Sequence, residues 1–119
     1  MRRPVTGTMV LGLVAVLAGC GGAQLNQAKL SQAESAVSAA EAVGAPQNPR
    51  AELHLQFARD EMAAAKRLAK EGEGEDSSLL LDRAKADAEL ALTLAKTDQE
   101  QQKARDAWNK VRELKEEKR

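Results

Sequence analysis

The sequence predicts an all-α fold: an antiparallel helical hairpin within a three-helix bundle, with a long C-terminal helix, after a cleaved signal peptide. Alanine is the commonest residue, with 23 copies among 119 residues, whereas isoleucine and tyrosine are absent. Alanine favours helices, while sheets favour β-branched and aromatic residues, so this composition is typical of helices. Apolar residues also recur at spacings of three and four, which places them on one face of a helix.

The overall composition excludes several classes of protein. The chain has 18 basic and 18 acidic residues, and its net charge of zero argues against a surface that follows nucleic-acid phosphates. One phenylalanine and one tryptophan cannot form the stacking platforms of single-strand binders. A single cysteine excludes a disulfide framework within the chain and a cysteine-rich zinc site. We therefore expect no nucleic-acid partner. We also expect no cofactor, apart from a covalent lipid that the N-terminal residues predict.

The N-terminus has the features of an export signal. Arg2 and Arg3 precede an apolar stretch at 5–18, which is shorter than the roughly 20 residues that a membrane-spanning helix needs. The stretch ends in Leu17, Ala18, Gly19 and Cys20, which resemble the lipobox of bacterial lipoproteins at all four positions. The resemblance implies removal of residues 1–19, diacylglycerol on the Cys20 thiol, acylation of the new amine by a chain such as palmitate, and a short linker at 20–23.

Two other interpretations of Cys20 remain open: an ordinary signal peptide with a chance cysteine, or a buried structural cysteine. Two or three acyl chains hold a protein stably at a membrane, whereas one chain does not. Gly21 follows the cysteine, where an aspartate would resemble an inner-membrane retention signal. The sequence therefore predicts a lipid-anchored protein of the cell envelope, at the outer membrane and facing the periplasm.

Two breaks divide the helical domain at 24–119. The first contains two prolines at 44–49, and the second is the glycine-rich acidic stretch at 72–76. We expect helices at about 24–43, 49–71 and 77–117. Asn48 and Pro49 are suited to the cap and first residue of the second helix, and Asp76, Ser77 or Ser78 to the cap of the third.

Each predicted helix carries a stripe of mostly small apolar residues. The stripes consist of Leu30, Ala33, Val37 and Ala40; of Ala51, Leu55, Ala58, Met62, Ala65 and Ala69; and of Leu81, Ala84, Ala88, Ala91 and Ala95, with Leu90 and Leu94 beside the last. Small residues let helix axes approach to the short end of about 8–10 Å. The second and third helices should form a tight antiparallel hairpin, with the first helix packed along its groove.

The third helix is the longest if it is continuous. It would then extend beyond its partners by roughly 30 Å, at about 1.5 Å per residue. Trp108, Val111 and Leu114 lie in this extension and form a possible contact for another envelope protein or for a second copy. Alternatively, the helix breaks at Thr97 and Asp98 with a capping box, folds back and buries Trp108.

Candidate chemical sites are few. The sequence contains neither a phosphate-binding loop nor a metalloprotease HExxH motif, and its one histidine, His54, is expected at the surface or at the edge of the core. Glu73, Glu75 and Asp76 are candidates for binding a divalent cation. Their spacing does not match an EF-hand loop, which favours a solvated turn.

Two alanine-rich segments carry a family resemblance. Ala58-Arg59-Asp60-Glu61-Met62-Ala63-Ala64-Ala65 and Ala84-Lys85-Ala86-Asp87-Ala88-Glu89-Leu90-Ala91 look like bacterial envelope lipoproteins of the domain of unknown function 4398 family, over about residues 45–107. The resemblance implies a periplasmic helical hairpin and brings no catalytic residues. We therefore expect a non-enzymatic, membrane-anchored lipoprotein with a structural or adaptor role, or alternatively one that binds a ligand or a divalent cation.

Overall fold

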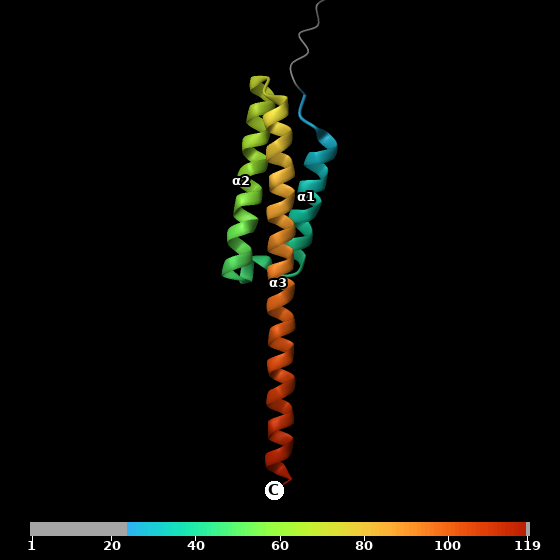
Figure 1. Cartoon of the computed structure of the whole chain (residues 1–119), viewed down its shortest axis with the longest axis vertical. Helices are drawn as coiled ribbons and strands as arrows, with labels where there is room; N and C mark the ends of the chain where they lie inside the picture. Colours follow the sequence, from blue (N-terminus) through green and yellow to red (C-terminus); the bar gives the residue numbers. More distant parts are fainter. Residues whose placement is uncertain (1–23, 119) are drawn as a thin grey trace, which may run out of the picture.

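The computed structural model describes residues 24–118, which form an all-α fold. Its elements are α1 (Gln27–Ala42), the 3₁₀ turn η1 (Ala45–Gln47), α2 (Pro49–Glu71) and α3 (Gly74–Glu117). Figure 1 shows α3 in the centre, α1 and α2 on either side of it, and the end of α3 extending beyond both. The predicted signal peptide, lipobox and Cys20 lie outside the described residues. No described helix combines the length and hydropathy needed to cross a membrane.

Helix α1 begins at Gln27, three residues later than predicted, because Asn26 caps it. The Asn26 side chain accepts a hydrogen bond from the Lys29 backbone N–H at 3.1 Å. The helix ends before Gly44, whose φ of +85° lies in the left-handed region that favours glycine. The chain then turns through η1 and enters α2.

The predicted start of α2 is confirmed. The Asn48 side-chain oxygen accepts hydrogen bonds from the backbone N–H groups of Arg50 and Ala51, both at 3.0 Å. Pro49 is the first helical residue, a position where the missing N–H costs no hydrogen bond. One side chain therefore satisfies two of the donors that a helix start leaves unpaired.

The turn between α2 and α3 is shorter than predicted. Gly72 has φ +89°, its N–H donates to the Ala69 carbonyl at 3.3 Å, and the Glu73 N–H donates to the Leu68 carbonyl at 2.9 Å. This arrangement is a Schellman cap, which lets the chain reverse at once. Helix α3 consequently begins at Gly74, not at residue 77.

The predicted caps of α3 are therefore wrong. Asp76, Ser77 and Ser78 are helical, and the N-cap residue is Glu73, whose side chain makes no capping hydrogen bond. Ser77 is instead fully buried between the helices, and its Oγ donates to the Ala65 carbonyl at 2.8 Å. The two-residue turn brings the start of α3 directly against α2, so this hydroxyl links the two helices.

The predicted apolar stripes form the core, except that Met62 and Ala69 are only half-buried. Within residues 24–118, most buried side chains are alanines, and the only large apolar ones that are fully buried are Leu55 and Leu81. Leu55 belongs to a cluster at the η1 end of the bundle, and Leu81 to a smaller cluster with Leu30 and Ala65 near the α2–α3 turn. The beside-stripe residue Leu90 is exposed, whereas Leu94 packs against the larger cluster.

Ion pairs at the rim of the core connect α1 to both other helices. Lys29 binds Asp82 of α3 at 2.6 Å, Lys66 of α2 binds Glu34 at 3.4 Å, and Arg59 of α2 binds Glu41. Each pair is substantially exposed, so each contributes about 1 kcal/mol or less. Their main effect is to favour one register of α1 along the hairpin.

Helix α3 is continuous, so the predicted break at Thr97 and Asp98 does not occur. The Thr97 hydroxyl donates to the Thr93 carbonyl at 2.9 Å, and the Asp98 carboxylate accepts from Gln102 at 2.8 Å, so neither residue forms a capping box. The hydrogen bond from Gln99 to the Val43 carbonyl, at 2.7 Å, marks the end of the bundle. Residues 100–117 then form a free extension of about 27 Å at 1.5 Å per residue.

Candidate functional site

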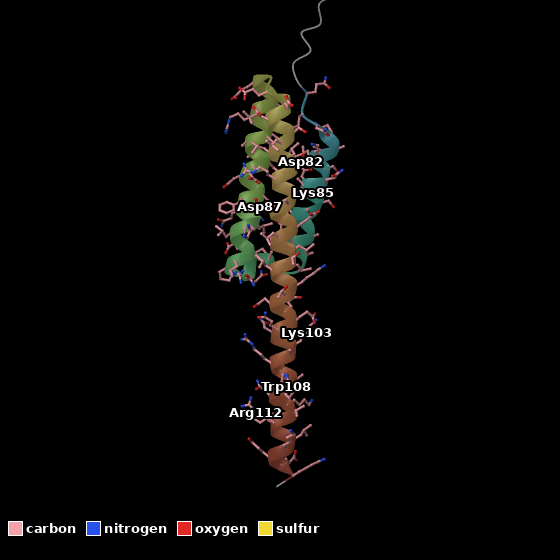
Figure 2. All side chains as sticks on the ribbon, in the orientation of Figure 1. Asp82, Lys85, Asp87, Lys103, Trp108 and Arg112 are labelled. Atoms are coloured by element: carbon pink, nitrogen blue, oxygen red, sulfur yellow. The ribbon has the colours of Figure 1, made fainter. Side chains whose placement is uncertain are left out.

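The extension of α3 presents large apolar side chains to solvent. The exposed fractions are 70% for Trp108, 42% for Val111 and 49% for Leu114. In Figure 2 the labelled Trp108 and Arg112 lie on the part of α3 that passes beyond α1 and α2. All three residues predicted as a contact surface are thus exposed together on one segment, and folding of the described chain does not bury them.

The apolar residues of the extension face away from the side of α3 that the bundle uses. Ala95 is the last buried residue of the core stripe, and the extension stripe starts nine residues later at Ala104. At about 100° per residue, nine residues place Ala104 half a turn away from Ala95. The positions that continue the core stripe are polar instead, namely Gln102, Arg105, Asn109 and Arg112. The extension therefore presents no apolar stripe on the face of α3 against which α1 and α2 pack.

Trp108 also lies beside basic side chains. A shallow hollow with a volume of about 390 Å³ is lined by Trp108, Val111, Arg112 and Lys115. The Arg112 guanidinium donates to the Asn109 side chain at 2.8 Å, which holds it along the helix. The hollow therefore combines one apolar aromatic face with two cations, a combination that suits an anionic partner with apolar groups.

A second polar cluster lies between α2 and α3. His54 Nδ1 and Asp87 Oδ1 are 2.8 Å apart, and the His54 ring meets the edge of Phe57 at a centroid distance of 6.0 Å. Arg83 pairs with Glu61 at 3.0 Å. His54 was predicted at the surface or at the edge of the core, near Phe57, but its pairing with Asp87 was not predicted. The spacing of these residues along the chain could have indicated the cluster. His54 and Glu61 share one face of α2, and Arg83 and Asp87 share one face of α3.

The pKa of Glu61 is shifted by its surroundings in this cluster. Burial raises the pKa of Glu61, the Asp87 carboxylate raises it further, and the Arg83 guanidinium partly lowers it. Glu61 Oε2 is buried without a hydrogen-bond partner. Glu61 can therefore take up a proton, and the cluster links α2 to α3. A small hollow of about 210 Å³ lies beside the cluster and is lined by Phe57, Asp60, Glu61, Arg83 and Asp87.

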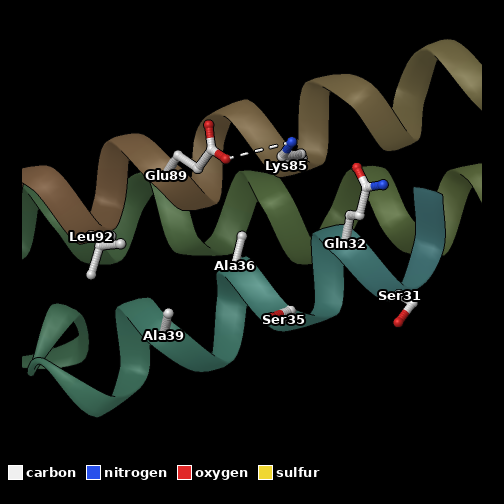
Figure 3. Close-up of a pocket in the computed structure, with 8 residues that line it drawn as sticks. All are labelled: Ser31, Gln32, Ser35, Ala36, Ala39, Lys85, Glu89 and Leu92. Carbon is white, nitrogen blue, oxygen red and sulfur yellow. Dashed lines mark ion pairs between the residues drawn. The ribbon is translucent and has the colours of Figure 1, made fainter. Parts of the chain in front are cut away.

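An open groove runs between α1 and α3. Its volume is about 480 Å³, and Figure 3 shows small side chains from α1 facing the ion pair of Lys85 with Glu89 at 3.7 Å. The other lining residues are Ser31, Gln32, Ser35, Ala36, Ala39 and Leu92. These short side chains leave the groove shallow, and it offers a ligand few directed polar contacts.

The acidic tip does not gather a cation site. Glu73, Glu75 and Asp76 are exposed at the start of α3, where the carboxylates of Glu75 and Asp76 complement the positive end of the helix dipole. Within residues 24–118, no three histidine, cysteine, aspartate or glutamate side chains are arranged to hold a metal ion. The geometry thus gives these carboxylates a role in the helix start.

Comparison with known families identifies the fold domain. A family model described as "Domain of unknown function (DUF4398)" matches residues 28–107. The chain belongs to the DUF4398 family. The match begins in α1, so it covers more of the chain than the predicted 45–107, and it ends at Ala107, just before Trp108. No curated protein and no solved structure matches the chain.

Proposed function

We propose that this protein is a non-enzymatic lipoprotein, anchored by Cys20 at the periplasmic face of the outer membrane and acting as a structural or adaptor module. The observation that carries the proposal is the coincidence of a basic start, an apolar run and Leu17-Ala18-Gly19-Cys20 with the only cysteine of the chain. A diacylated and N-acylated Cys20 would carry three acyl chains, whereas a single chain does not give stable anchoring.

The arrangement of the helices supports an adaptor role. The start of α1 and the α2–α3 turn lie at the same end of the bundle, and the free end of α3 lies at the other end (Figure 1). An anchor at Cys20, seven residues before α1, would keep the first end near the membrane. The extension with Trp108 would then project into the periplasm, where a partner can reach it.

The polar contacts support a role without catalysis. The pairs of His54 with Asp87 and of Arg83 with Glu61 join α2 to α3. The groove between α1 and α3 is open and shallow, whereas catalytic sites exclude water to strengthen their electrostatics. The chain therefore offers a rigid rod with an exposed end, which is suited to holding a partner at a distance from the membrane.

Metabolic labelling with an alkyne fatty acid tests the anchor. The wild-type chain should incorporate the label, sediment with outer-membrane vesicles on a density gradient, and shift in mobility when lipoprotein signal peptidase is inhibited. Cys20→Ala should lose the label, whereas the neighbouring control Gly21→Ala should retain it. A wild-type chain that carries no lipid and stays in the soluble fraction would overturn the proposal.

A further inference from the structure

The extension of α3 carries a short heptad pattern that the bundle does not use. Ala104, Ala107, Val111 and Leu114 follow spacings of three, four and three, the pattern of a coiled-coil interface. We call these four residues the seam. All four are exposed, and they lie half a turn away from the core stripe, so a helix could pack along them without displacing α1 or α2.

Three of the four charged residues that border the seam are lysines. In a coiled coil, the residues just before and just after the apolar positions meet those of the partner. Here they are Lys103, Lys110 and Glu117 on one side, and Gln101, Trp108 and Lys115 on the other. Among the ion pairs of residues 24–118, none involves Lys110 or Lys115, and the pair of Lys103 is with exposed Glu100 of the same helix.

Among the acidic side chains of the extension, Glu100 pairs with Lys103 and Glu117 is itself a border residue, but the others lie away from the border. Asp106 and Glu113 occupy the same heptad position, and Glu116 lies opposite the seam. The extension thus has an apolar side bordered by Lys103, Lys110, Lys115 and Trp108. Its other side carries most of the acids together with Arg105 and Arg112. Border charges of this kind select the partner of a coiled coil, because opposite charges attract and like charges repel across it.

The same charges disfavour pairing with a second copy. Two chains anchored in one membrane would present their extensions in parallel, a step that rests on the proposed function. In a parallel pair, Lys110 of each copy would face Lys115 of the other, and Glu100 would face Glu100 at a seam-like position. Like charges that face each other across an interface are destabilising.

We propose that the seam binds an amphipathic helix of another protein, whose apolar stripe is bordered by glutamate or aspartate residues. Acids at those positions meet Lys103, Lys110 and Lys115, while Trp108 covers the apolar edge of the partner. The partner helix runs along the outer side of α3. The seam also extends past Ala107, where the family match ends, so this contact lies partly outside the shared domain.

Titration with designed helical peptides tests the proposal. The full chain, reconstituted in nanodiscs of neutral phosphatidylcholine, is titrated with a three-heptad peptide that carries leucine at its apolar positions and glutamate at both borders. The comparison peptide carries lysine at the borders, and neither contains tryptophan. Because Trp108 is the only tryptophan of the chain, its emission reports binding directly. We expect a blue shift with the glutamate peptide and at least about tenfold weaker binding of the lysine peptide.

Charge-reversal variants locate the contact. Lys110→Glu with Lys115→Glu should reverse the preference between the two peptides. Arg67→Glu with Arg105→Glu changes the net charge equally but outside both the border positions and the hollow beside Trp108, and should keep the preference for the glutamate peptide. Circular dichroism of both variants verifies that the helices remain folded.

Three results would overturn the proposal: equal binding of both peptides, a blue shift that grows with protein concentration in the absence of peptide, or binding to anionic lipid vesicles as tight as to the glutamate peptide. The second result would assign the seam to a second copy, and the third to a membrane surface. The fatty-acid label reports only on lipid attachment at Cys20, and the peptide titration reports only on binding at the seam. Failure of anchoring and failure of the seam are therefore distinguishable.

Discussion

Replacing Leu55 with alanine should remove a large part of the stability of the bundle. Leu55 is fully buried, and the buried residues around it in its cluster are mostly alanines. Alanine side chains are too short to fill the space that the lost isobutyl group leaves, so both the transfer and the cavity contributions apply. Buried leucine-to-alanine changes cost about 2–5 kcal/mol, and we expect a value in the upper half of that range.

That loss is large relative to the total unfolding free energy of the domain. A domain of about 95 residues has an unfolding free energy of roughly 5–14 kcal/mol, at about 0.05–0.15 kcal/mol per residue. The matched control is Leu53→Ala on the same helix, where the side chain is 49% exposed. Full burial of a leucine is worth about 1.5–3 kcal/mol, so loss of a half-exposed one should cost about 1 kcal/mol or less.

Urea unfolding followed by circular dichroism at the helix band measures both variants. The linear extrapolation gives the free energy of unfolding of each, and equal slopes indicate that the two states are comparable. If Leu55→Ala lowers the free energy of unfolding no more than Leu53→Ala does, the inference that Leu55 fills space which the surrounding alanines cannot fill is refuted.

Three further predictions concern separate parts of the molecule. Trp108 of the dilute chain should emit near the wavelength of water-exposed tryptophan and be quenched readily by acrylamide, because 70% of its side chain is exposed; a blue, protected emission would contradict a free extension. Asn48→Ala should lower the unfolding free energy by about 0.5–2 kcal/mol, measured by urea unfolding, because two N–H groups lose their acceptor. Burial gives Glu61 a folded-state pKa above its ordinary 4.5, so the folded protein binds this proton more tightly than the unfolded chain. The stability of wild type relative to Glu61→Gln should therefore fall as pH rises from 4.5 through the raised pKa, and a pH-independent difference in urea unfolding would contradict the shift.

Helix starts and apolar faces could be predicted where the signal is local. Asn48 followed by Pro49 has one favourable arrangement, a capped helix start, because the asparagine oxygen reaches the next N–H groups without help from distant residues. The alanine stripes were equally predictable, since the period of a helix determines which residues share a face. The exposed state of Trp108, Val111 and Leu114 was one of two alternatives that the sequence left open.

Long-range contacts could not be predicted in the same way. Ser77 had the residue type and place of a helix cap, yet it is buried against the Ala65 carbonyl because the turn at Gly72 needs only two residues. The partners of His54 and Glu61 depend on the register between α2 and α3. That register follows from the turn and from packing, and no local pattern encodes it.

The sequence by itself determined the helical class, the three apolar stripes and the start of α2, because each depends only on helix period or on neighbouring residues. Tertiary structure decided that α3 starts at Gly74 and that His54 meets Asp87, and it selected continuity at Thr97 over a break. In the folded chain, Thr97 and Asp98 bond within α3 and Gln99 bonds to the Val43 carbonyl at the end of the bundle. The extension is straight because helical bonding continues beyond the last packed residue.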